Sequence, residues 1–260
     1  MHVRSLGFRT DLMLRRLARA SVVDRGDHLV IRTTDNPGFY WGNFLLIDPP
    51  PAGTSSRWLD EFAREFPEAE HVAIGVDGVD GDTGDVSELL AAGLEIEPNV
   101  VLTAHALRPS GRPVEAEVRP LRSDSDWQQM VAVRLAVDED DSQAHREFVE
   151  RKATEARRLA TQGHGVYVGA FVDGVVRASL GIVTDGSGLA RYQAVETHPE
   201  HRRRGLAGAM LVAAADAALT RLGAQTLVIV ADPDYVAIDL YRSLGFSDTE
   251  RQMQLQRARK

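Results

Sequence analysis

The sequence predicts a mixed α/β protein whose first half repeats part of the order of elements found in its second half. Apolar runs rich in β-branched residues alternate with segments of helical period, and Gly and Asp-Gly turns separate them. LLAAGLEIE over residues 89–97 also parallels LYRSLGFSD over residues 240–248, which indicates an internal repeat. Because 260 residues exceed the roughly 100–150 of a common domain, we expect two domains, 1–110 and 111–260, joined by a linker over 107–116.

The first half is expected to open with a β-hairpin around Asp24-Arg25-Gly26-Asp27 and to continue with alternating helices and strands. Trp58, Phe62 and Phe66 recur at helical spacing and predict an amphipathic helix. The predicted strands cover 22–23, 29–32, 43–47, 71–76 and 100–104, and the predicted helices cover 55–66 and 86–92.

The second half reads as a complete domain of one strand, two helices, three strands, a helix, a strand, a helix and a last strand. Asp173-Gly174 joins two apolar runs as a two-residue hairpin turn, whereas Gly223 and Gly245 stand where helices end. Helices are predicted over 126–137, 143–161, 204–222 and 236–244, and strands over 166–172, 175–183, 189–197, 226–231 and 252–256.

Composition narrows the class of function. The chain has 30 Lys and Arg against 38 Asp and Glu, a net charge of −8, which disfavours nucleic-acid binding. It has no Cys, so it forms no disulfide or thiolate metal site, and we expect no metal. No apolar run approaches the roughly 20 residues of a membrane span, and the N-terminus lacks the apolar core of a secretory signal. We therefore expect a cytoplasmic protein that binds no membrane.

An anion site is predicted where the strand over 189–197 leads into the following helix. The first N–H groups of a helix have no partner within the helix, and its dipole is positive there, so cations at this point are disfavoured unless an anion offsets them. Gly lets a phosphate approach the backbone, and Arg adds charge-assisted hydrogen bonds. The segment concerned contains Arg202, Arg203, Arg204, Gly205, Leu206, Ala207 and Gly208.

Two motifs in the second half resemble the GNAT acyltransferase superfamily. Arg202-x-x-Gly205-x-Ala207 is similar to its acetyl-CoA pyrophosphate loop, and AIDLYRSLGF over 237–246 is similar to its A-x-x-L-Y-x-x-x-G-F helix. The resemblance covers about residues 115–260. It implies an acyl-CoA N-acyltransferase fold with acetyl-CoA as cosubstrate.

The resemblance also implies roles for single residues. The backbone of Val195, Glu196 and Thr197 would bind the pantetheine arm, the N–H groups of residues 203–208 would hold the pyrophosphate, and Tyr241 would protonate the leaving thiolate. Asp234 stands where relatives often carry an Asn that contacts pantetheine. In the first half the corresponding junction, LIDPPPAGTSS over 46–56, has three Pro and no Arg, so this half resembles a degenerate copy without the phosphate loop.

The identity of the general base stays open between Glu196, His198, His201 and water. Strict strand alternation puts Glu196 on the face opposite Arg191 and Gln193, unless a bulge at the strand end interrupts it. The acidic residues 138–141 either form a solvated loop before a helix capped by Ser142 or attract a cationic acceptor.

The sequence thus predicts an enzyme that transfers an acetyl group from acetyl-CoA to a primary amine by direct attack in a ternary complex. The acceptor is expected to be a small molecule or a peptide, and the enzyme a monomer or a homodimer. The alternative is a CoA-binding sensor or scaffold without catalytic activity.

Overall fold

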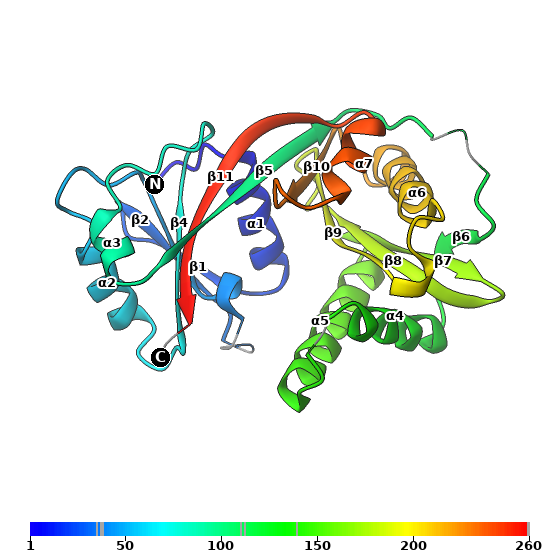
Figure 1. Ribbon diagram of the computed structural model, residues 1–260, viewed down its shortest axis with the longest axis horizontal. Coiled ribbons are helices and arrows are strands. Elements are labelled where there is room, and N and C mark those ends of the chain that lie inside the picture. The colour runs from blue at the N-terminus through cyan, green and yellow to red at the C-terminus, as the bar shows by residue number, and fades with distance from the viewer. Residues whose placement is uncertain (35, 37–38, 110, 112, 139, 259–260) are drawn as a thin grey trace. The chain divides into compact units, whose positions relative to one another are not determined.

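The computed structural model describes residues 1–34, 36, 39–109, 111, 113–138 and 140–258 (Figure 1). They form two compact units that interleave along the chain. Unit 1 contains Met1–Leu102, Val230–Ile238 and the residues from Asp248 onward, and unit 2 contains Thr103–Ile229 and Asp239–Ser247. The division into domains 1–110 and 111–260 stays a prediction, and residues 110 and 112 of the predicted linker lie outside the described residues.

Unit 1 is built on a mixed sheet with the strand order β1-β2-β3-β4-β11-β5. The predicted hairpin is present as the antiparallel pair β1–β2, β3 joins it antiparallel, and β4 is parallel to β3. The C-terminal strand β11 pairs antiparallel with β4, so the end of the chain completes the sheet of unit 1. The strands are β1 (Ser21–Asp24), β2 (His28–Arg32), β3 (Phe44–Ile47), β4 (His71–Val76), β5 (Glu95–Ala104) and β11 (Ser247–Ala258).

Helices cover both faces of this sheet, which explains why its central strands are apolar throughout. Along β3, Phe44 and Leu46 belong to one core cluster together with Phe8 and Leu12 of helix α1. Leu45 and Ile47 belong to the opposite cluster, which also holds Trp58 and Phe62 of α2 and Leu89 of α3. The helices are α1 (Leu6–Leu17), α2 (Arg57–Glu65) and α3 (Ser87–Ala91), and a short 3-10 turn, η1, covers Tyr40–Gly42.

Helix α1 was not predicted from the sequence. Ser5 caps it by accepting the Phe8 N–H, but the remaining caps come from distant parts of the chain. The Asp77 carboxylate accepts the Ser5 N–H at 3.1 Å, and the Glu250 carboxylate accepts the Leu6 N–H at 2.8 Å. These acceptors satisfy N–H groups that a helix leaves unpaired at its start.

Unit 2 is built on the strand order β10-β9-β8-β7-β6. The predicted meander is confirmed, because β6, β7, β8 and β9 pair antiparallel in succession, and β10 joins β9 in parallel. The strands are β6 (Glu117–Pro120), β7 (Gly165–Val172), β8 (Val175–Val183), β9 (Leu189–Thr197) and β10 (Thr226–Ala231).

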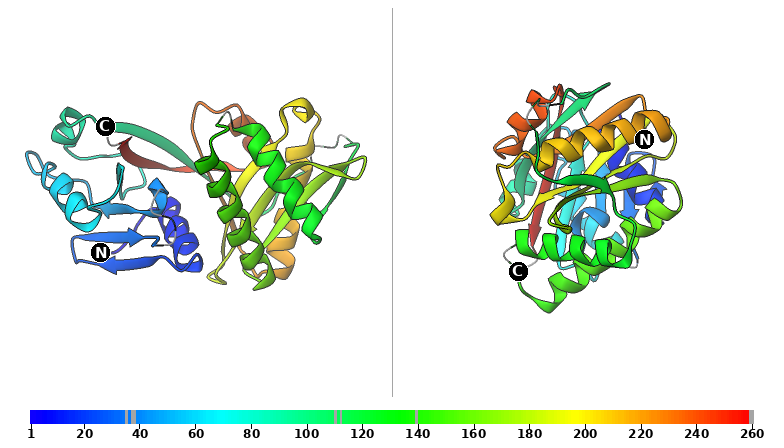
Figure 2. Two further views of the ribbon diagram at one scale, coloured as in Figure 1. Left: turned by 90° about the horizontal axis from the view of Figure 1, so that it is seen from below. Right: turned by 90° about the vertical axis from the view of Figure 1, so that its right-hand side faces the viewer.

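The sheet of unit 2 lies between α6 on one face and the pair α4 and α5 on the other (Figure 2). Helix α6 is rich in Ala, and its buried Ala214, Ala215 and Ala218 allow it to approach the sheet closely. Ser142 caps α5 as predicted, by accepting the His145 N–H. The helices are α4 (Asp124–Val137), α5 (Gln143–Thr161), α6 (Leu206–Arg221) and α7 (Ala237–Ser243), and a 3-10 turn, η2, covers Pro199–His201.

The two segments that suggested an internal repeat end their helices with the same hydrogen bonds. After α3, Gly93 donates to the Leu90 carbonyl and Leu94 donates to the Leu89 carbonyl. After α7, Gly245 donates to the Arg242 carbonyl and Phe246 donates to the Tyr241 carbonyl. Both glycines have a left-handed φ, +86° and +109°. The repeated sequence pattern therefore corresponds to a repeated helix-to-strand turn.

Across the described parts of the chain, no helix is both long enough and apolar enough to cross a membrane.

Candidate active site

The loop between β9 and α6 has the backbone geometry of an anion site. Two of its residues adopt the left-handed region, Arg203 with φ +62° and Gly205 with φ +80°. Loops in which left-handed residues recur turn backbone N–H groups into concave arrangements that bind anions. Gly205 also stands at the N-cap of α6 and supplies no side chain to cap it.

The first turn of α6 has unused donors. The first hydrogen bond of the helix runs from the Ala209 N–H to the Gly205 carbonyl at 3.1 Å. Among the described residues, the N–H groups of Leu206, Ala207 and Gly208 have no acceptor. They coincide with the residues predicted to bind pyrophosphate.

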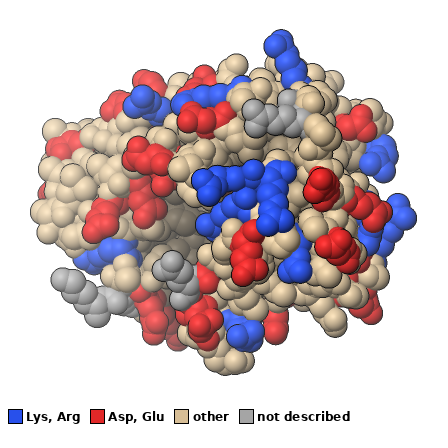
Figure 3. Space-filling view, turned by 45° about the vertical axis from the view of Figure 1, so that its right-hand side comes forward, with Lys and Arg blue, Asp and Glu red and all other residues tan. Residues whose placement is uncertain are grey.

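The guanidinium groups of this loop have no carboxylate counter-ion within the described part of the chain. Arg202, Arg203 and Arg204 are exposed, and no described carboxylate lies within 4 Å of any of them. Arg202 Nε donates instead to the Thr197 carbonyl at 3.4 Å. A space-filling view shows basic side chains gathered on one part of a surface of otherwise mixed charge (Figure 3). Positive charge without a counter-ion beside free N–H groups favours an anion of several charges.

Sequence reasoning missed a fourth cation, Arg177, at the start of β8. Its carbonyl accepts the His198 N–H at 2.9 Å, and its Nε has no partner in the part of the chain that is described. The pKa of His201 is lowered, first by partial burial and then by the positive charges of Arg177 and Arg204. Arg177 lies outside both sequence motifs and about 25 residues before the loop. The pairing of β8 with β9 brings it close to the loop.

Strand β9 contains the bulge that the prediction for Glu196 left open. Ser179 of β8 stands opposite Glu196 and Gly181 stands opposite Gln193, so β9 uses one residue more than β8 between these pairs. Ala194 has a left-handed φ of +48° within this interval. Because residues directly opposite one another share a face, Gln193 and Glu196 lie on the same face. Strict alternation, which put them on opposite faces, is thus wrong here.

Glu196 is buried and paired with a cation. Its side chain is 7% exposed and accepts a hydrogen bond from Nη1 of Arg134 on α4. Burial raises the pKa of the Glu196 carboxyl, and the positive charge of Arg134 opposes this rise. The Glu196 carboxylate therefore faces α4, on the side of the sheet opposite α6.

The end of β9 that was predicted to bind pantetheine lies beyond the described ladder with β10. That parallel ladder comprises only Leu189, Ala190 and Arg191 on the β9 side, whereas β9 continues to Thr197. The backbone of Val195 and Thr197 on that side of the strand is therefore not used by β10, and a bulged strand end of this kind can bind an extended ligand.

Tyr241 lies in α7, close to the first turn of α6. A Cβ built on Gly208 would lie 3.5 Å from Cδ1 of Leu240, the neighbour of Tyr241. Tyr241 is 4% exposed, and its ring meets Phe246 edge-on at 6.3 Å between centroids. This position is compatible both with a packing role for the Tyr241 ring and with its predicted role as the acid that protonates the thiolate. Asp234 is exposed in the turn after β10, where its N–H donates to Asp232, and it belongs to unit 1.

The equivalent junction in unit 1 is occupied by acidic side chains. The Glu88 carboxylate accepts the Ser56 N–H at 2.8 Å, and the Asp85 carboxylate accepts the Gly53 N–H at 3.1 Å. Carboxylates thus accept hydrogen bonds from N–H groups just before α2, whereas the loop before α6 carries Arg instead. The anion site predicted at α6 has no counterpart among the described residues of this junction.

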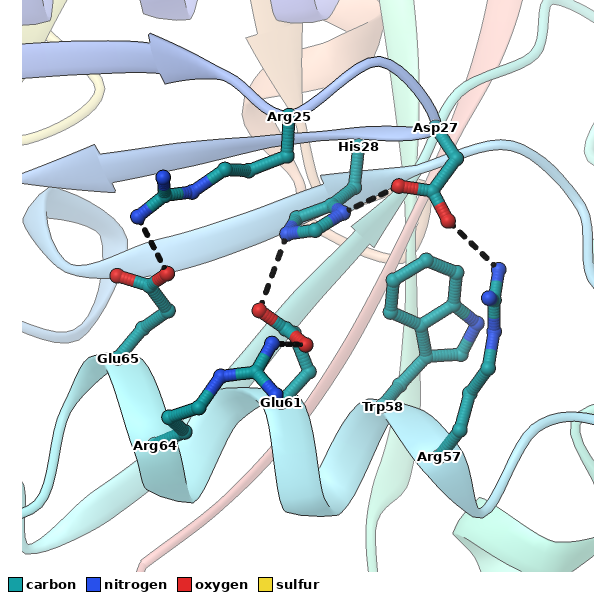
Figure 4. Close-up of a pocket in the computed structure, with 8 residues that line it drawn as sticks. All are labelled: Arg25, Asp27, His28, Arg57, Trp58, Glu61, Arg64 and Glu65. Carbon is teal, nitrogen blue, oxygen red and sulfur yellow. Dashed lines mark hydrogen bonds and ion pairs between the residues drawn. The ribbon is translucent and has the colours of Figure 1, made fainter.

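Unit 1 contains a polar pocket of about 440 Å³ between the β1–β2 turn and α2 (Figure 4). Its charges are paired with one another: Arg25 with Glu65 at 2.8 Å and Arg57 with Asp27 at 3.1 Å, with a third pair between Arg64 and Glu61. None of the predicted site residues lines it. Because its charges are paired and it lacks the predicted site residues, we regard this pocket as a weaker candidate active site than the loop before α6.

Comparison with known proteins finds a family match in the second half of the chain. Residues 131–246 match the model of the Acetyltransferase (GNAT) family. A sequence comparison with curated proteins finds no match.

Several solved structures are similar over nearly the whole chain. A functionally unknown conserved protein from Staphylococcus epidermidis has a TM-score of 0.70 at 12% identity, covering 93% of this chain and 95% of its own. A GCN5-related N-acetyltransferase from Kribbella flavida has a TM-score of 0.65 at 18% identity, covering 97% and 95%. A tandem GNAT protein from the clavulanic acid biosynthesis pathway has a TM-score of 0.57 at 13% identity, covering 95% and 88%.

Together with the sheet and the loop before α6, these similarities place the chain in the class of acyl-CoA N-acyltransferase folds, and the shared fold extends through its first half. Residues 131–246 are similar to GNAT-family acetyltransferase domains. The predicted fold class and the resemblance of both halves to GNAT domains are confirmed. The matched segment includes the loop at 202–208, Glu196 and Tyr241.

Proposed function

We propose that the protein transfers an acetyl group from acetyl-CoA to a primary amine by direct attack in a ternary complex. The observation that carries this proposal is the loop before α6, where three exposed Arg and unused N–H groups adjoin two left-handed residues. The pyrophosphate of coenzyme A is an anion that fits this donor set. In the proposed complex, Val195, Glu196 and Thr197 supply the backbone along pantetheine.

The chemistry begins when the bound ammonium loses a proton to Glu196, directly or through water. The neutral amine attacks the thioester carbonyl, the C–N bond forms, and a backbone N–H at the bulge of β9 stabilises the oxyanion. The C–S bond then breaks, and Tyr241 protonates the departing thiolate, whose basicity is close to that of a phenol. The attacking nitrogen then loses its second proton, which returns to the Tyr241 phenolate directly or through water, and Glu196 releases the first proton to solvent. The balance is one ammonium and one thioester converted into a neutral amide, a neutral thiol and one proton.

The remaining sequence-based expectations form part of the same proposal. The acceptor is a small-molecule or peptide amine, neither nucleic acid nor membrane is bound, and the protein acts in the cytoplasm as a monomer or a homodimer. No metal takes part. Asp234 contributes a contact to pantetheine that is weaker than that of an amide.

The test is acetyl-CoA binding by isothermal titration calorimetry to the wild type, Gly205→Glu and Gly223→Glu. Gly223 ends the same helix with a φ of +69° and open space around it, so its variant introduces the same charge and similar backbone strain away from the loop. We expect Gly205→Glu to weaken binding about tenfold or more, since a charge-assisted hydrogen bond is worth about 1.5–3 kcal/mol. Gly223→Glu should bind like the wild type.

Equal affinity of the wild type and Gly205→Glu would refute the assigned anion site. A panel of primary amines, assayed for thiol release and for the acetylated product, then tests catalysis. Tight binding of acetyl-CoA without transfer to any amine would instead indicate a CoA-binding sensor or scaffold.

A further inference from the structure

Four ionisable side chains from three elements form a continuous chain on the α4 and α5 face of unit 2. Glu196 of β9 pairs with Arg134 of α4. Arg134 Nε lies 2.9 Å from Oδ2 of Asp138, the residue that caps the end of α4. The same oxygen lies 3.0 Å from Nε2 of His145 in the first turn of α5. The guanidinium of Arg134 is therefore shared between two carboxylates.

The two carboxylates depend on Arg134 to different degrees. Glu196 is 7% exposed, whereas Asp138 is 26% exposed and is also contacted by His145. A carboxylate removed from water takes up a proton unless a positive charge or hydrogen bonds stabilise the ionised form. Among the described residues, Arg134 is the cation that pairs with Glu196, so the ionisation of Glu196 depends on that side chain.

Asp138 opposes the stabilisation of ionised Glu196 by Arg134. Its negative charge disfavours a second negative charge on Glu196, and it draws the Arg134 guanidinium toward the end of α4. The groups that face Glu196 are thus Arg134 and Asp138 from α4 and, through Asp138, His145 from α5. Ser179, its neighbour on β8, carries no charge. Glu139, in the acidic segment after α4, lies outside the described residues.

We propose that Arg134 is a positioning residue for acyl transfer, which keeps Glu196 ionised and oriented, and that Asp138 limits its strength by competing for the same guanidinium. The inference rests on the proposed role of Glu196 as the proton acceptor. A protonated Glu196 cannot take a proton from the acceptor ammonium, so the pair with Arg134 sets the lowest pH at which the amine becomes a nucleophile. Asp138, at the end of α4, thus acts on Glu196 through Arg134 rather than on a bound acceptor.

The experiment measures kcat against pH for acetyl transfer to one amine in the wild type, Arg134→Gln, Arg134→Lys and Asp138→Asn. Removing Arg134 raises the pKa of Glu196, so the acid limb of the profile should move to higher pH by about one to three units. Arg134→Lys keeps the charge and should restore most of the wild-type limb. Asp138→Asn should move the limb in the opposite direction, to lower pH.

A merely structural role would lower kcat at every pH and leave the limb in place. Opposite shifts for the variants of Arg134 and Asp138 support the inference, and unmoved limbs overturn it. Glu196→Gln serves as the reference, because it should remove the limb. Asp138→Asn keeps the pair between Glu196 and Arg134, so this arm remains informative if Arg134→Gln folds poorly.

A second readout separates this inference from the proposed function. In protein labelled with 13C at the Glu side-chain carboxyls, the resonance missing from Glu196→Gln identifies Glu196 and reports its titration without any substrate. If the wild type acetylates no amine, the proposed function fails, and the NMR titration still decides the role of Arg134. A Glu196 titration that is the same in the wild type and Arg134→Gln overturns the inference whatever the activity.

Discussion

The face of the sheet on which Glu196 lies depends on the conformation of Ala194, which could not be predicted from the sequence. Ala194 adopts a left-handed φ of +48°, a region that favours Gly and Asn, and the extra residue of the bulge turns Glu196 toward α4. The composition of the loop at 202–208 was predictable, because Arg and Gly before a helix have a direct physical meaning. The bulge was not, since alternation is the only local rule for a strand and the pairing with β8 overrides it.

Tyr241 carries the clearest catalytic prediction for a single residue. Tyr241→Phe keeps the ring against Phe246 and removes only the hydroxyl, so acetyl-CoA affinity should change little. Turnover should fall about 100-fold or more, which is the usual contribution of a general acid. Steady-state kinetics and calorimetry on the same samples measure the two effects.

Tyr192 offers a matched control for this substitution. Its hydroxyl donates to the Leu211 carbonyl of α6 at 2.8 Å in a buried setting, so Tyr192→Phe should cost about 1 kcal/mol of stability and leave the turnover unchanged. Turnover in Tyr241→Phe equal to that of the wild type would rule out the acid role.

Among the elements, α1 shows where sequence-based prediction ends. The helices at 143–161 and 204–222 were predicted because their caps and periods are local. Helix α1 receives its caps from Asp77 and Glu250, which lie about one quarter and almost the whole of the chain away. No window of sequence around residues 6–17 contains that information, because folding brings these carboxylates to the helix start.

Helix α4, which carries Arg134, begins with a capping box whose strength should depend on pH. The Arg119 guanidinium, together with the N–H groups of Arg122 and Ser123, holds the pKa of Asp126 far below its ordinary value. A carboxyl with a lowered folded-state pKa stabilises the fold above its unfolded pKa of about 3.9, and this stabilisation is lost as the pH falls below that value.

We therefore expect Asp126→Asn to lower the free energy of unfolding by about 2 kcal/mol at pH 7 and by progressively less below about pH 4. Urea denaturation at pH 7, 5 and 3 measures the difference. Asp124→Asn is the control, because Asp124 is 78% exposed in the same turn and pairs only at the surface. A deficit for Asp126→Asn that stays constant from pH 7 to pH 3 would contradict the assignment.

At the scale of the whole molecule, both halves resemble GNAT domains, and they differ at the junctions before α2 and α6. The turns after α3 and α7 repeat the same hydrogen bonds, and solved GNAT structures are similar across both halves. Free N–H groups and Arg precede α6, whereas Asp85 and Glu88 occupy the donors before α2. The sequence predicted this asymmetry through its three Pro and missing Arg, but it did not predict that Asp85 and Glu88 accept hydrogen bonds from the N–H groups before α2.

The assignment of β11 to unit 1 gives a prediction about how the whole chain unfolds. Leu255 has no exposed surface, stands opposite Ile74 of β4 and belongs to the core cluster of α2 and α3. Leu255→Ala should therefore cost about 2–5 kcal/mol, as cavity-forming substitutions do. The loss should fall on unit 1, although residue 255 lies in the half of the sequence that carries the GNAT domain.

Amide hydrogen exchange followed by mass spectrometry can locate this loss. Leu255→Ala should weaken protection in β3 and β4 and leave β7 and β8 as in the wild type, because these strand pairs belong to different compact units. Leu180→Ala, a cavity of the same chemistry in β8, should give the reverse pattern. Weakened protection of β7 and β8 in Leu255→Ala, with β4 unaffected, would show that the C-terminal strand supports the second half of the chain rather than the first.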